Sequence, residues 1–334
     1  MVSRFNCAYS KARWSAQGVA LGSALGVAFS INLTGRGRPE SLSAVLEFLV
    51  IPYPNIDPVA FALGPFVVKW YGLSYMAGLL LGWLYIRHLL STPSIWANGL
   101  APFDVAKVDD LLLYMTLGVI LGGRMGSILF YEPGYYMQHP LEVLQIWKGG
   151  MAFHGALLGT GAAIWLFARH KGISMWSTMD VCASAVPIGL FFGRLANFIN
   201  GELFGRPTNM PWGMVFPRVA ETYPQFAGLE PTPRHPSQLY EAFGEGLLLF
   251  VVLRLLTHVF KGLKTPGLAV GMFLIGYAVA RSTCELFRQP DPAHAFTVAG
   301  LTPGITYSIP MLFLGAYFIH MARVRGNGGA LQQA

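Results

Sequence analysis

The chain has 334 residues, of which 54% are hydrophobic and only 12% are charged. Ordinary soluble domains carry roughly 25% charged residues, so this composition excludes a typical water-soluble protein and indicates that much of the chain faces lipid. The formal net charge is +7, but the basic residues are scattered singly at the ends of apolar runs, which argues against a nucleic-acid-binding surface. The three cysteines lie far apart without disulfide or metal-binding spacing, and we expect neither a metal nor a cofactor.

Seven apolar runs are long enough to cross a bilayer as helices, which takes about 20 mostly apolar residues each. In chain order they lie near residues 70–90, 111–131, 151–168, 180–200, 240–260, 266–287 and 305–322. The sequence therefore predicts an all-α polytopic membrane protein with seven transmembrane helices.

Basic residues are shared unevenly between the two sets of connections. Nine lie in alternate connections and at the C-terminus: Arg87, Lys107, Arg169, Lys171, Arg254, Lys261, Lys264, Arg323 and Arg325. The opposite connections contain the longest loop and yet hold only five: Lys148, Arg206, Arg218, Arg234 and Arg288. By the positive-inside rule, we expect the C-terminus, with a tail of residues 323–334, to be cytoplasmic.

Residues 1–45 precede the first predicted span and form a separate extension. Arg4, Lys11 and Arg13 come before an apolar stretch over residues 18–33. A charged start followed by an apolar run is typical of a signal sequence or an extra span, which would deliver residues 40–69 to the outer face. A poorly ordered extension, or translation that begins further downstream, is an open alternative.

Ionisable side chains within a span cost roughly 2.5 to 3.5 kcal/mol each, so we treat them as candidates for a functional site. The clearest group lies in residues 193–205 (GRLANFINGELFG). Helical spacing predicts one broad face with Arg194, Asn197, Gly201 and Gly205. Glycine lets a ligand approach the backbone while Arg and Asn donate hydrogen bonds, which suits an anionic group such as phosphate. The alternative is helix packing through small residues, with Arg194 paired to Glu202.

Charges also lie in the sixth and second predicted spans. Along one face of the sixth, at i, i+4, i+8 and i+11, stand Tyr277, Arg281, Glu285 and Arg288. These charges either face a cavity or, in the structural interpretation, neutralise each other. In the second span Arg124 lies among glycines (GGRMG), where close helix contact explains the pattern equally well.

Two further motifs stand at the starts of spans. His154 lies in WKGGMAFHGA, and its unperturbed pKa near 6.5 suits proton transfer at neutral pH, although a lone histidine is more often structural. The motif RHPSQLYE (234–241) ends the longest loop, and there Ser237 is positioned to cap the next helix.

The segment GRLANFINGELFGR resembles the signature of the bacterial prolipoprotein diacylglyceryl transferases. Supporting motifs follow in the same chain order: WYGLSYMAG near Trp70, GGRMG near Arg124, GGMAFHG near His154, RHPSQLYE near Arg234 and GYAVARSTCELFRQPD near Arg281. They cover about residues 46–322, where the resemblance implies one seven-helix transferase domain in the bacterial inner membrane. It also implies the reaction: the diacylglyceryl group of phosphatidylglycerol passes to the lipobox cysteine thiol of a lipoprotein precursor and glycerol phosphate is released.

The resemblance further implies which residues serve the site. The family's important positions are occupied here by Tyr71, His154, Arg194, Asn197, Gly205 and Arg281, with Glu202, Tyr277 and Glu285 beside them. Three departures from the family pattern, Ala156, Ala196 and Ser127, remove no functional group on which this assignment depends.

From these residues we expect the following division of roles. Arg194 and Arg281 bind the phosphate, because guanidinium forks match phosphate oxygens and stay charged when desolvated. Asn197 and Tyr71 orient the head group, Glu202 and Glu285 hold the arginines, and Arg124 is a further candidate for substrate binding. His154 is the candidate base for the acceptor thiol, whose unperturbed pKa is near 8.5. The expected partners are phosphatidylglycerol, a prolipoprotein signal peptide and the lipid bilayer, with no nucleic acid.

Two other classes of protein compete with this interpretation. A transporter or lipid flippase would bind a phosphate head group with the same arginines but without chemistry, and such folds favour broken helices and internal repeats; the sequence shows no repeat. An intramembrane protease or phosphatase ranks lower, because the chain has no Gly-x-Ser-x-Gly turn, no HExxH motif and no paired aspartates within its spans.

Overall fold

The computed structural model describes residues 51–54, 56–64, 66–146, 149–227, 232–290 and 300–331. The predicted N-terminal extension, residues 1–45, lies outside the described residues, as do Lys148 and the last three residues of the predicted tail.

A β-hairpin precedes the first helix and departs from the all-α prediction. Strand β1 (Val59–Leu63) pairs antiparallel with β2 (Phe66–Lys69), and Leu63 lies opposite Phe66. The local sequence is rich in Val and Phe, which favour strands, and Gly64 takes a positive φ of 60° at the turn. The chain is therefore a mostly helical, rather than an all-helical, membrane protein.

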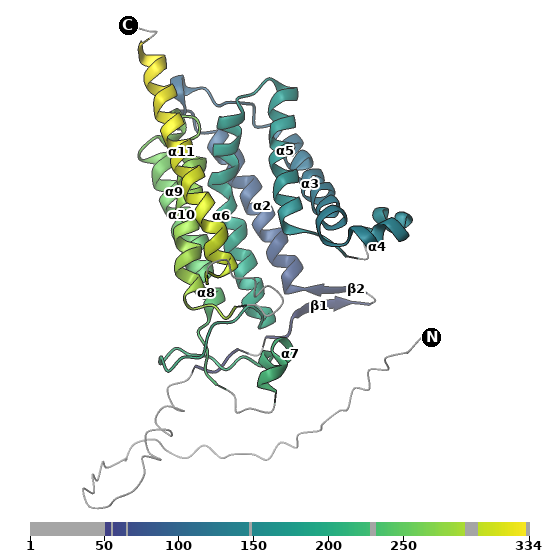
Figure 1. Cartoon of the computed structure of the whole chain (residues 1–334). Coiled ribbons are helices and arrows are strands. Elements are labelled where there is room, and N and C mark those ends of the chain that lie inside the picture. Colours follow the sequence, from purple (N-terminus) through teal and green to yellow (C-terminus); the bar gives the residue numbers. More distant parts are fainter. Residues whose placement is uncertain are drawn as a thin grey trace, which may run out of the picture. The chain divides into compact units, whose positions relative to one another are not determined.

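The helices follow in the order of their labels (Figure 1): α2 (Trp70–Leu90), α3 (Lys107–Gly126), α4 (Pro133–Gln138), α5 (Phe153–Lys171), α6 (Met175–Asn200), α7 (Val219–Thr222), α8 (Ser237–Glu241), α9 (Leu249–His258), α10 (Leu268–Glu285) and α11 (Pro303–Leu331). Short 3-10 turns lie in the connections: η1 (Pro93–Ile95), η2 (Ala97–Gly99), η4 (Pro140–Leu144), η6 (Pro224–Phe226) and η8 (Gly262–Lys264). Each predicted apolar run therefore coincides with helical structure, within a few residues.

Four helices have the length and hydropathy to cross a membrane within the part of the chain that the structure describes. They span Trp70–Leu90, Lys107–Tyr131, Met175–Ile199 and Pro303–Arg325. Helix α10 carries Arg281 and Glu285 within its 18 residues, and the fifth predicted span is divided into short segments. The chain is thus a polytopic membrane protein, while the count of seven spans stays a prediction.

Helix α6 lies at the centre of the helical packing. It contacts α2, α5, α8, α9 and α10, and Figure 1 shows it among the other long helices. Its buried face is lined mostly by small residues, including Cys182, Ala183 and Ala185, which allow neighbouring backbones to approach closely. A central helix with neighbours on several sides can present its polar residues only to protein or to a cavity.

Helices α6 and α10 are tied together at the end remote from Arg194. The carboxylate of Asp180, a fully buried residue of α6, accepts hydrogen bonds from the backbone N–H groups of Gly267 (2.6 Å) and Val270 (2.8 Å). These N–H groups belong to the first turn of α10, where an α-helix has no internal acceptors for them. Asp180 thus caps a neighbouring helix and sets the position of α10 against α6.

The fifth helical segment changes its winding partway along. Helix α8 continues directly into the π-helical segment η7 (Ala242–Leu248), which continues into α9. A second π-helical segment, η3 (Ser127–Tyr131), extends α3. π-Helical turns are rare and frequently lie at functional sites. Segment η7 packs directly against α6 and α10.

The long connection between α6 and α8 folds over the end of α6. Its backbone forms bridges between Gly205 and Arg288 and between Met214 and Arg234. A hydrophobic, mostly aromatic cluster supports it, and its buried members are Phe198, Phe204, Met214, Phe216 and Tyr223. The described part of the connection, residues 201–227 and 232–236, therefore forms a cap that holds the 201–205 segment in place.

Candidate active site

A cluster of buried charges lies where α6, α8, η7 and α10 meet. It consists of Arg194, Glu241, Glu245, Arg281, Glu285 and Arg288, and we call it the arginine–glutamate cluster. The side chains of Glu241 and Glu245 are fully buried, and the three arginine side chains are 13 to 16% exposed. Buried charges at membrane depth are stable only when they are paired and hydrogen-bonded, which is the arrangement found here.

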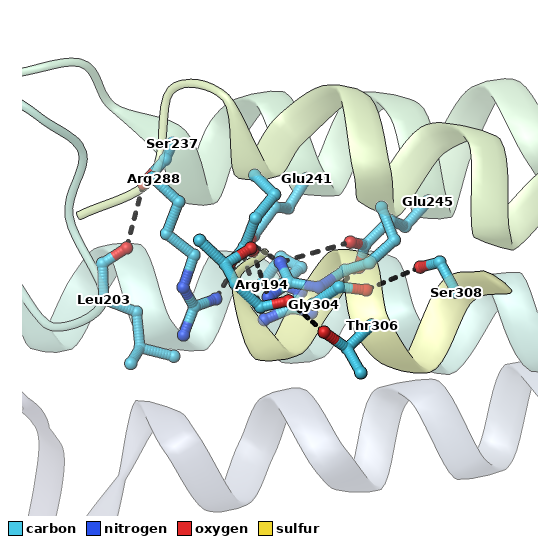
Figure 2. Close-up of polar contacts among 12 residues, drawn as sticks. Arg194, Leu203, Ser237, Glu241, Glu245, Arg288, Gly304, Thr306 and Ser308 are labelled. Atoms are coloured by element: carbon cyan, nitrogen blue, oxygen red, sulfur yellow. Dashed lines mark hydrogen bonds and ion pairs between the residues drawn. The ribbon is translucent and has the colours of Figure 1, made fainter. Parts of the chain in front are cut away.

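Arg194 lies between two carboxylates of the fifth helical segment. Its Nη1 is 3.1 Å from Glu241 Oε2, while its Nε and Nη2 both donate to Glu245 Oε2, at 3.1 and 2.9 Å. Figure 2 shows the guanidinium between the two glutamates. The two acids stand at i and i+4 across the junction of α8 and η7, so they share one face of the helix.

Arg281 and Arg288 complete the cluster from the end of α10. Arg281 Nη1 donates to Glu241 Oε1 at 2.5 Å, and its Nη2 is 2.6 Å from Glu285 Oε2. Arg288 Nη1 donates to the same Glu241 oxygen at 2.8 Å. Glu241 therefore contacts all three arginines. The predicted pairing of Arg281 with Glu285 is present as well.

The first turn of α11 packs against this cluster (Figure 2). A Cβ on Gly304 would lie 2.5 Å from Glu285 Oε2 and 3.0 Å from Arg281 Nη2. One turn later the buried Ser308 hydroxyl donates to the Gly304 carbonyl. Only glycine allows α11 to approach the charges so closely, and this helix helps to exclude lipid and water from them.

An apolar groove of about 720 Å³ reaches the cluster from one side. Apolar side chains of α2, α3 and α6 form its walls, among them Met76, Leu79 and Val119. Arg194 and Asn197 are the polar residues at its α6 wall. We call it the α2/α6 groove. A hydrocarbon groove with a guanidinium and an amide on one wall matches a ligand that has both apolar chains and an anionic group.

Asn197 and Glu202 contact each other beside the cluster. Asn197 Nδ2 donates to Glu202 Oε1 at 2.8 Å, and the backbone carbonyl of Glu202 accepts a 2.6 Å hydrogen bond from Gln238 Nε2. Glu202 therefore orients Asn197, whereas the sequence pattern predicted that it holds an arginine. The carboxylates that bind Arg194 are Glu241 and Glu245.

Tyr71 and Tyr277 lie near these groups. The Tyr71 hydroxyl is 3.1 Å from that of Tyr75, which lines the α2/α6 groove. Tyr277 lies on α10, one turn before Arg281. The structure thus gathers Arg194, Asn197, Arg281 and their predicted neighbours around one region.

Arg124 and Gly205, two of the predicted site residues, have different surroundings from the residues described so far. Arg124 donates to the backbone carbonyls of Glu142, Val143 and Gly149, and its guanidinium lies 4.9 Å from the Tyr136 ring centroid. Its contacts hold the connection after η3, while the close helix contact expected at this motif is made by the neighbouring Gly122 and Gly126 against α5.

Gly205 does not continue the helical face expected from spacing, because α6 ends at Asn200 and Gly201 takes a left-handed φ of 65°. A Cβ on Gly205 would lie 2.5 Å from the His235 carbonyl oxygen and 2.6 Å from that of Phe287. Its role in the structure is to let three backbone segments meet. Tyr53 closes the same end of α6 by donating to the carbonyls of Phe198 (2.5 Å) and Ile199 (3.0 Å), and burial raises the pKa of its hydroxyl.

His154 stands at the start of α5 with an exposed side chain. Its Nδ1 is 3.2 Å from the Tyr131 hydroxyl, and its ring makes an edge contact with Tyr307 of α11. Tyr307 follows Gly304 by one helical turn, so His154 approaches the region of the cluster through α11. No hydrogen bond joins it to the arginines among the contacts described.

Glu241 and Glu245 are site residues that the sequence motifs did not identify. A signal is present, because two glutamates four residues apart begin an otherwise apolar run (EAFGEGLLLFVV). It is weak, because Glu241 ends the RHPSQLYE motif and lies at the edge of the predicted span. No group of three or more His, Cys, Asp or Glu side chains that could hold a metal is present within the described ranges.

The fold and the cluster define the class of protein as a polytopic membrane protein with a buried ionic site that opens to an apolar groove. Residues 58–321 match the family model described as prolipoprotein diacylglyceryl transferase. The phosphatidylglycerol–prolipoprotein diacylglyceryl transferase of Rhizobium meliloti (strain 1021) is 50% identical over 275 residues, covering 82% of this chain and 95% of that protein. The protein of that name from Nitrobacter winogradskyi is 47% identical over 289 residues, 86% and 95% of the two chains. The one from Agrobacterium fabrum is 46% identical over 283 residues, 84% and 98%.

The chain therefore belongs to the prolipoprotein diacylglyceryl transferase family. This confirms the family predicted from the sequence, and with it the prediction of a membrane transferase of lipoprotein biosynthesis. The transporter and protease interpretations are set aside.

Proposed function

We propose that the chain transfers the diacylglyceryl group of phosphatidylglycerol to the lipobox cysteine thiol of a lipoprotein precursor at the arginine–glutamate cluster. The transfer itself is the activity of the family to which the chain belongs. This location of the site is supported by Arg194, which belongs both to the buried cluster and to the wall of the α2/α6 groove.

The groove suits the donor lipid. Its apolar walls provide a surface for acyl chains, and a phosphodiester placed at Arg194 and Asn197 would accept hydrogen bonds from both. Arg281 approaches the same carboxylates from α10, and its Nη1 lies 3.8 Å from Glu245 Oε1. Tyr71 and Tyr75 stand at the end of α2 beside the groove, where their hydroxyl groups orient the glycerol head group.

The chemistry follows from this placement. The acceptor sulfur attacks the glyceryl carbon that bears the phosphate, a carbon–sulfur bond forms, the carbon–oxygen bond to phosphate breaks, and glycerol phosphate leaves. Negative charge grows on the leaving phosphate, and guanidinium groups fixed in a site that excludes water stabilise it strongly. Glu241 and Glu285 keep the arginines in place before the lipid arrives.

His154 takes the proton of the acceptor thiol in this proposal. Its exposed ring near Tyr131 and Tyr307 is open to an incoming peptide. Tyr307 lies one turn of α11 after Gly304, which packs against Glu285. A neutral imidazole is a suitable base near pH 7.

The membrane arrangement is part of the proposal. Seven helical segments cross the bacterial inner membrane, comprising the four clear spans together with α5, the α8–η7–α9 segment and α10. The C-terminus is cytoplasmic, and residues 46–322 form the catalytic domain. The cluster then lies toward the outer side, where the lipobox of an exported precursor arrives.

Purified protein incubated with labelled phosphatidylglycerol and a lipobox peptide tests the function. We expect the peptide to gain the mass of one diacylglyceryl unit, and a peptide with serine in place of the lipobox cysteine to gain none. If the cysteine peptide keeps its mass while the protein is folded, the proposed transfer is wrong.

A further inference from the structure

The arginine–glutamate cluster has no spare positive charge with which to receive an anion. Its described members are three arginines, Arg194, Arg281 and Arg288, and three glutamates, Glu241, Glu245 and Glu285. When all six are ionised, the cluster is neutral. A phosphodiester that binds there would leave one uncompensated negative charge in a buried site, which is strongly unfavourable.

Phosphate and Glu245 also compete for the same donors. Arg194 offers its Nε and Nη2 atoms, the edge that pairs best with a planar anion, to the single oxygen Glu245 Oε2. Because Arg194 is the cluster arginine that lines the α2/α6 groove, a phosphodiester coming from the groove meets this arginine first.

Glu245 is less well neutralised than Glu241, which contacts three arginines within 3.1 Å. The second oxygen of Glu245, Oε1, is buried without a hydrogen-bond partner among the described contacts, and the nearest arginine nitrogen, Arg281 Nη1, is 3.8 Å away. Within the described part of the chain, Glu241 Oε2 and Glu285 Oε2 also lack a hydrogen bond, but each has an arginine nitrogen within 3.1 Å. The charged and titratable groups that face Glu245 are Arg194 from α6, Glu241 from its own segment and, from α10, Tyr277, Arg281 and Cys284.

We propose that Glu245 takes up one proton from solvent when the phosphodiester displaces it from Arg194, so that donor binding is linked to protonation. The neutral acid stays buried at little cost, Arg194 keeps its fork for the phosphate, and the net charge of the cluster is restored. The proton returns to solvent when the anionic product leaves. This inference rests on the proposed function and adds a positioning residue to it.

The linkage fixes the direction of the pH dependence. Because binding consumes a proton, affinity for phosphatidylglycerol falls as pH rises. The Kd increases by up to about tenfold per pH unit over the range in which Glu245 is ionised in the free protein and protonated in the complex. The phosphodiester itself stays a monoanion throughout that range and contributes no slope.

Calorimetric titration of the full-length protein with short-chain phosphatidylglycerol, in buffers of different ionisation enthalpy, counts the protons directly. We expect uptake of about one proton per lipid bound, and none with short-chain diacylglycerol, which lacks the phosphate. Binding of phosphatidylglycerol without proton uptake overturns the inference and leaves the proposed function intact. Failure of phosphatidylglycerol to bind overturns both.

The variant Glu245→Gln removes the titrating group but retains an oxygen that can accept from Arg194. We expect its Kd to be nearly independent of pH and, at high pH, lower than that of the wild type. A purely structural role predicts the opposite, namely weaker binding at every pH. Glu221→Gln, at an outer-loop acid whose side chain is 74% exposed, is the matched control and should keep the wild-type slope. Should Glu245→Gln fail to fold, the proton count of the wild type alone decides.

Discussion

At the scale of single residues, the contacts of Arg194 depend on the shape of its guanidinium group as well as on its charge. It contacts two fully buried carboxylates through three nitrogens and at the same time lines the α2/α6 groove. A point charge cannot reproduce this geometry, because the contacts are directed along the edges of a planar fork.

Replacement of Arg194 by lysine keeps the charge and removes the fork. We expect kcat/KM for diacylglyceryl transfer to fall by about ten- to a hundredfold, since one or two directed hydrogen bonds to the leaving phosphate are lost. The measurement is transfer of labelled lipid to a lipobox peptide by the purified variant. Arg87→Lys, at an exposed site 3.8 Å from Asp109, is the control and should retain activity. Full activity of Arg194→Lys would rule out the forked contact.

Replacement of His154 by alanine tests the proposed base. We expect kcat to fall by about a hundredfold or more while KM for phosphatidylglycerol changes little, because the imidazole acts on the acceptor thiol. His139→Ala, at a histidine stacked on Tyr135, is the control. If His154→Ala keeps its activity, another group must deprotonate the thiol.

The sequence identifies individual residues whose charge makes insertion into lipid unfavourable. It does not identify the residues with which they form ion pairs. Arg194 and Arg281 were identified because charged residues inside apolar runs are expensive. Their partner Glu241 could not be assigned, because it lies 47 residues after Arg194 and neither spacing nor composition shows which helices adjoin. For the same reason the long-range contacts of Arg124 with backbone carbonyls were not predictable.

At the scale of elements, the contact between α3 and α5 depends on glycine on both sides. A Cβ on Gly159 would clash with the carbonyl of Gly118 and lie 2.8 Å from the Cα of Gly122. Two residues later in the same helix, Gly161 faces open space, with nothing within 4 Å of a built Cβ. Gly159 therefore serves close packing, whereas Gly161 does not.

These two glycines provide a matched pair of substitutions. We expect Gly159→Ala to lower the stability of the protein by about 1 to 3 kcal/mol, because the backbones of α3 and α5 must separate. Gly161→Ala should be neutral or stabilising by up to about 1 kcal/mol, because alanine favours the helix. Thermal unfolding in detergent compares them, and equal effects of the two substitutions would contradict the packing argument.

The helical elements were predictable from apolar periodicity and length, but their interruptions were not. Helical spacing predicted one continuous face from Arg194 to Gly205. In the structure α6 ends at Asn200, because Gly201 adopts a left-handed conformation. The hairpin of β1 and β2 was also missed, since its apolar residues resemble the start of a span. Local conformation at glycine depends on contacts that arrive from distant parts of the chain.

At the scale of the whole molecule, the distribution of basic residues predicts which face of the membrane each connection occupies. Labelling of introduced cysteines in intact cells tests this in a Cys7→Ser background, in which the remaining Cys182 and Cys284 are buried. An impermeant thiol reagent should label Asn209→Cys, in the connection between α6 and α8, from outside. It should label Lys264→Cys, between α9 and α10, only after permeabilisation. The reverse pattern would invert the proposed topology and place the cluster near the cytoplasm.

Composition predicted a membrane protein and the positions of its helical segments. It did not predict how many of these segments form single helices that are long and apolar enough to cross a membrane. Helix α10 and the fifth segment carry four of the six charges of the arginine–glutamate cluster, which reduce their hydropathy, and the fifth segment is also divided into short pieces. Helix α6 carries Arg194 and still has the length and hydropathy of a span.

The π-helical segment η7 determines how this helix responds when residues are added to it or removed from it. A π-helical turn holds one residue more than the α-helical turn around it, so deleting a single residue from η7 after Glu245 would restore ordinary winding and leave α8 and α9 in their orientations. An inserted residue has no such outlet and would turn the preceding part of the helix by about 100°, which would move Glu241 away from all three arginines although every other amino acid is unchanged. We therefore expect this segment to accept the loss of a residue more readily than a gain, and an insertion between Glu241 and Leu249 to abolish transfer.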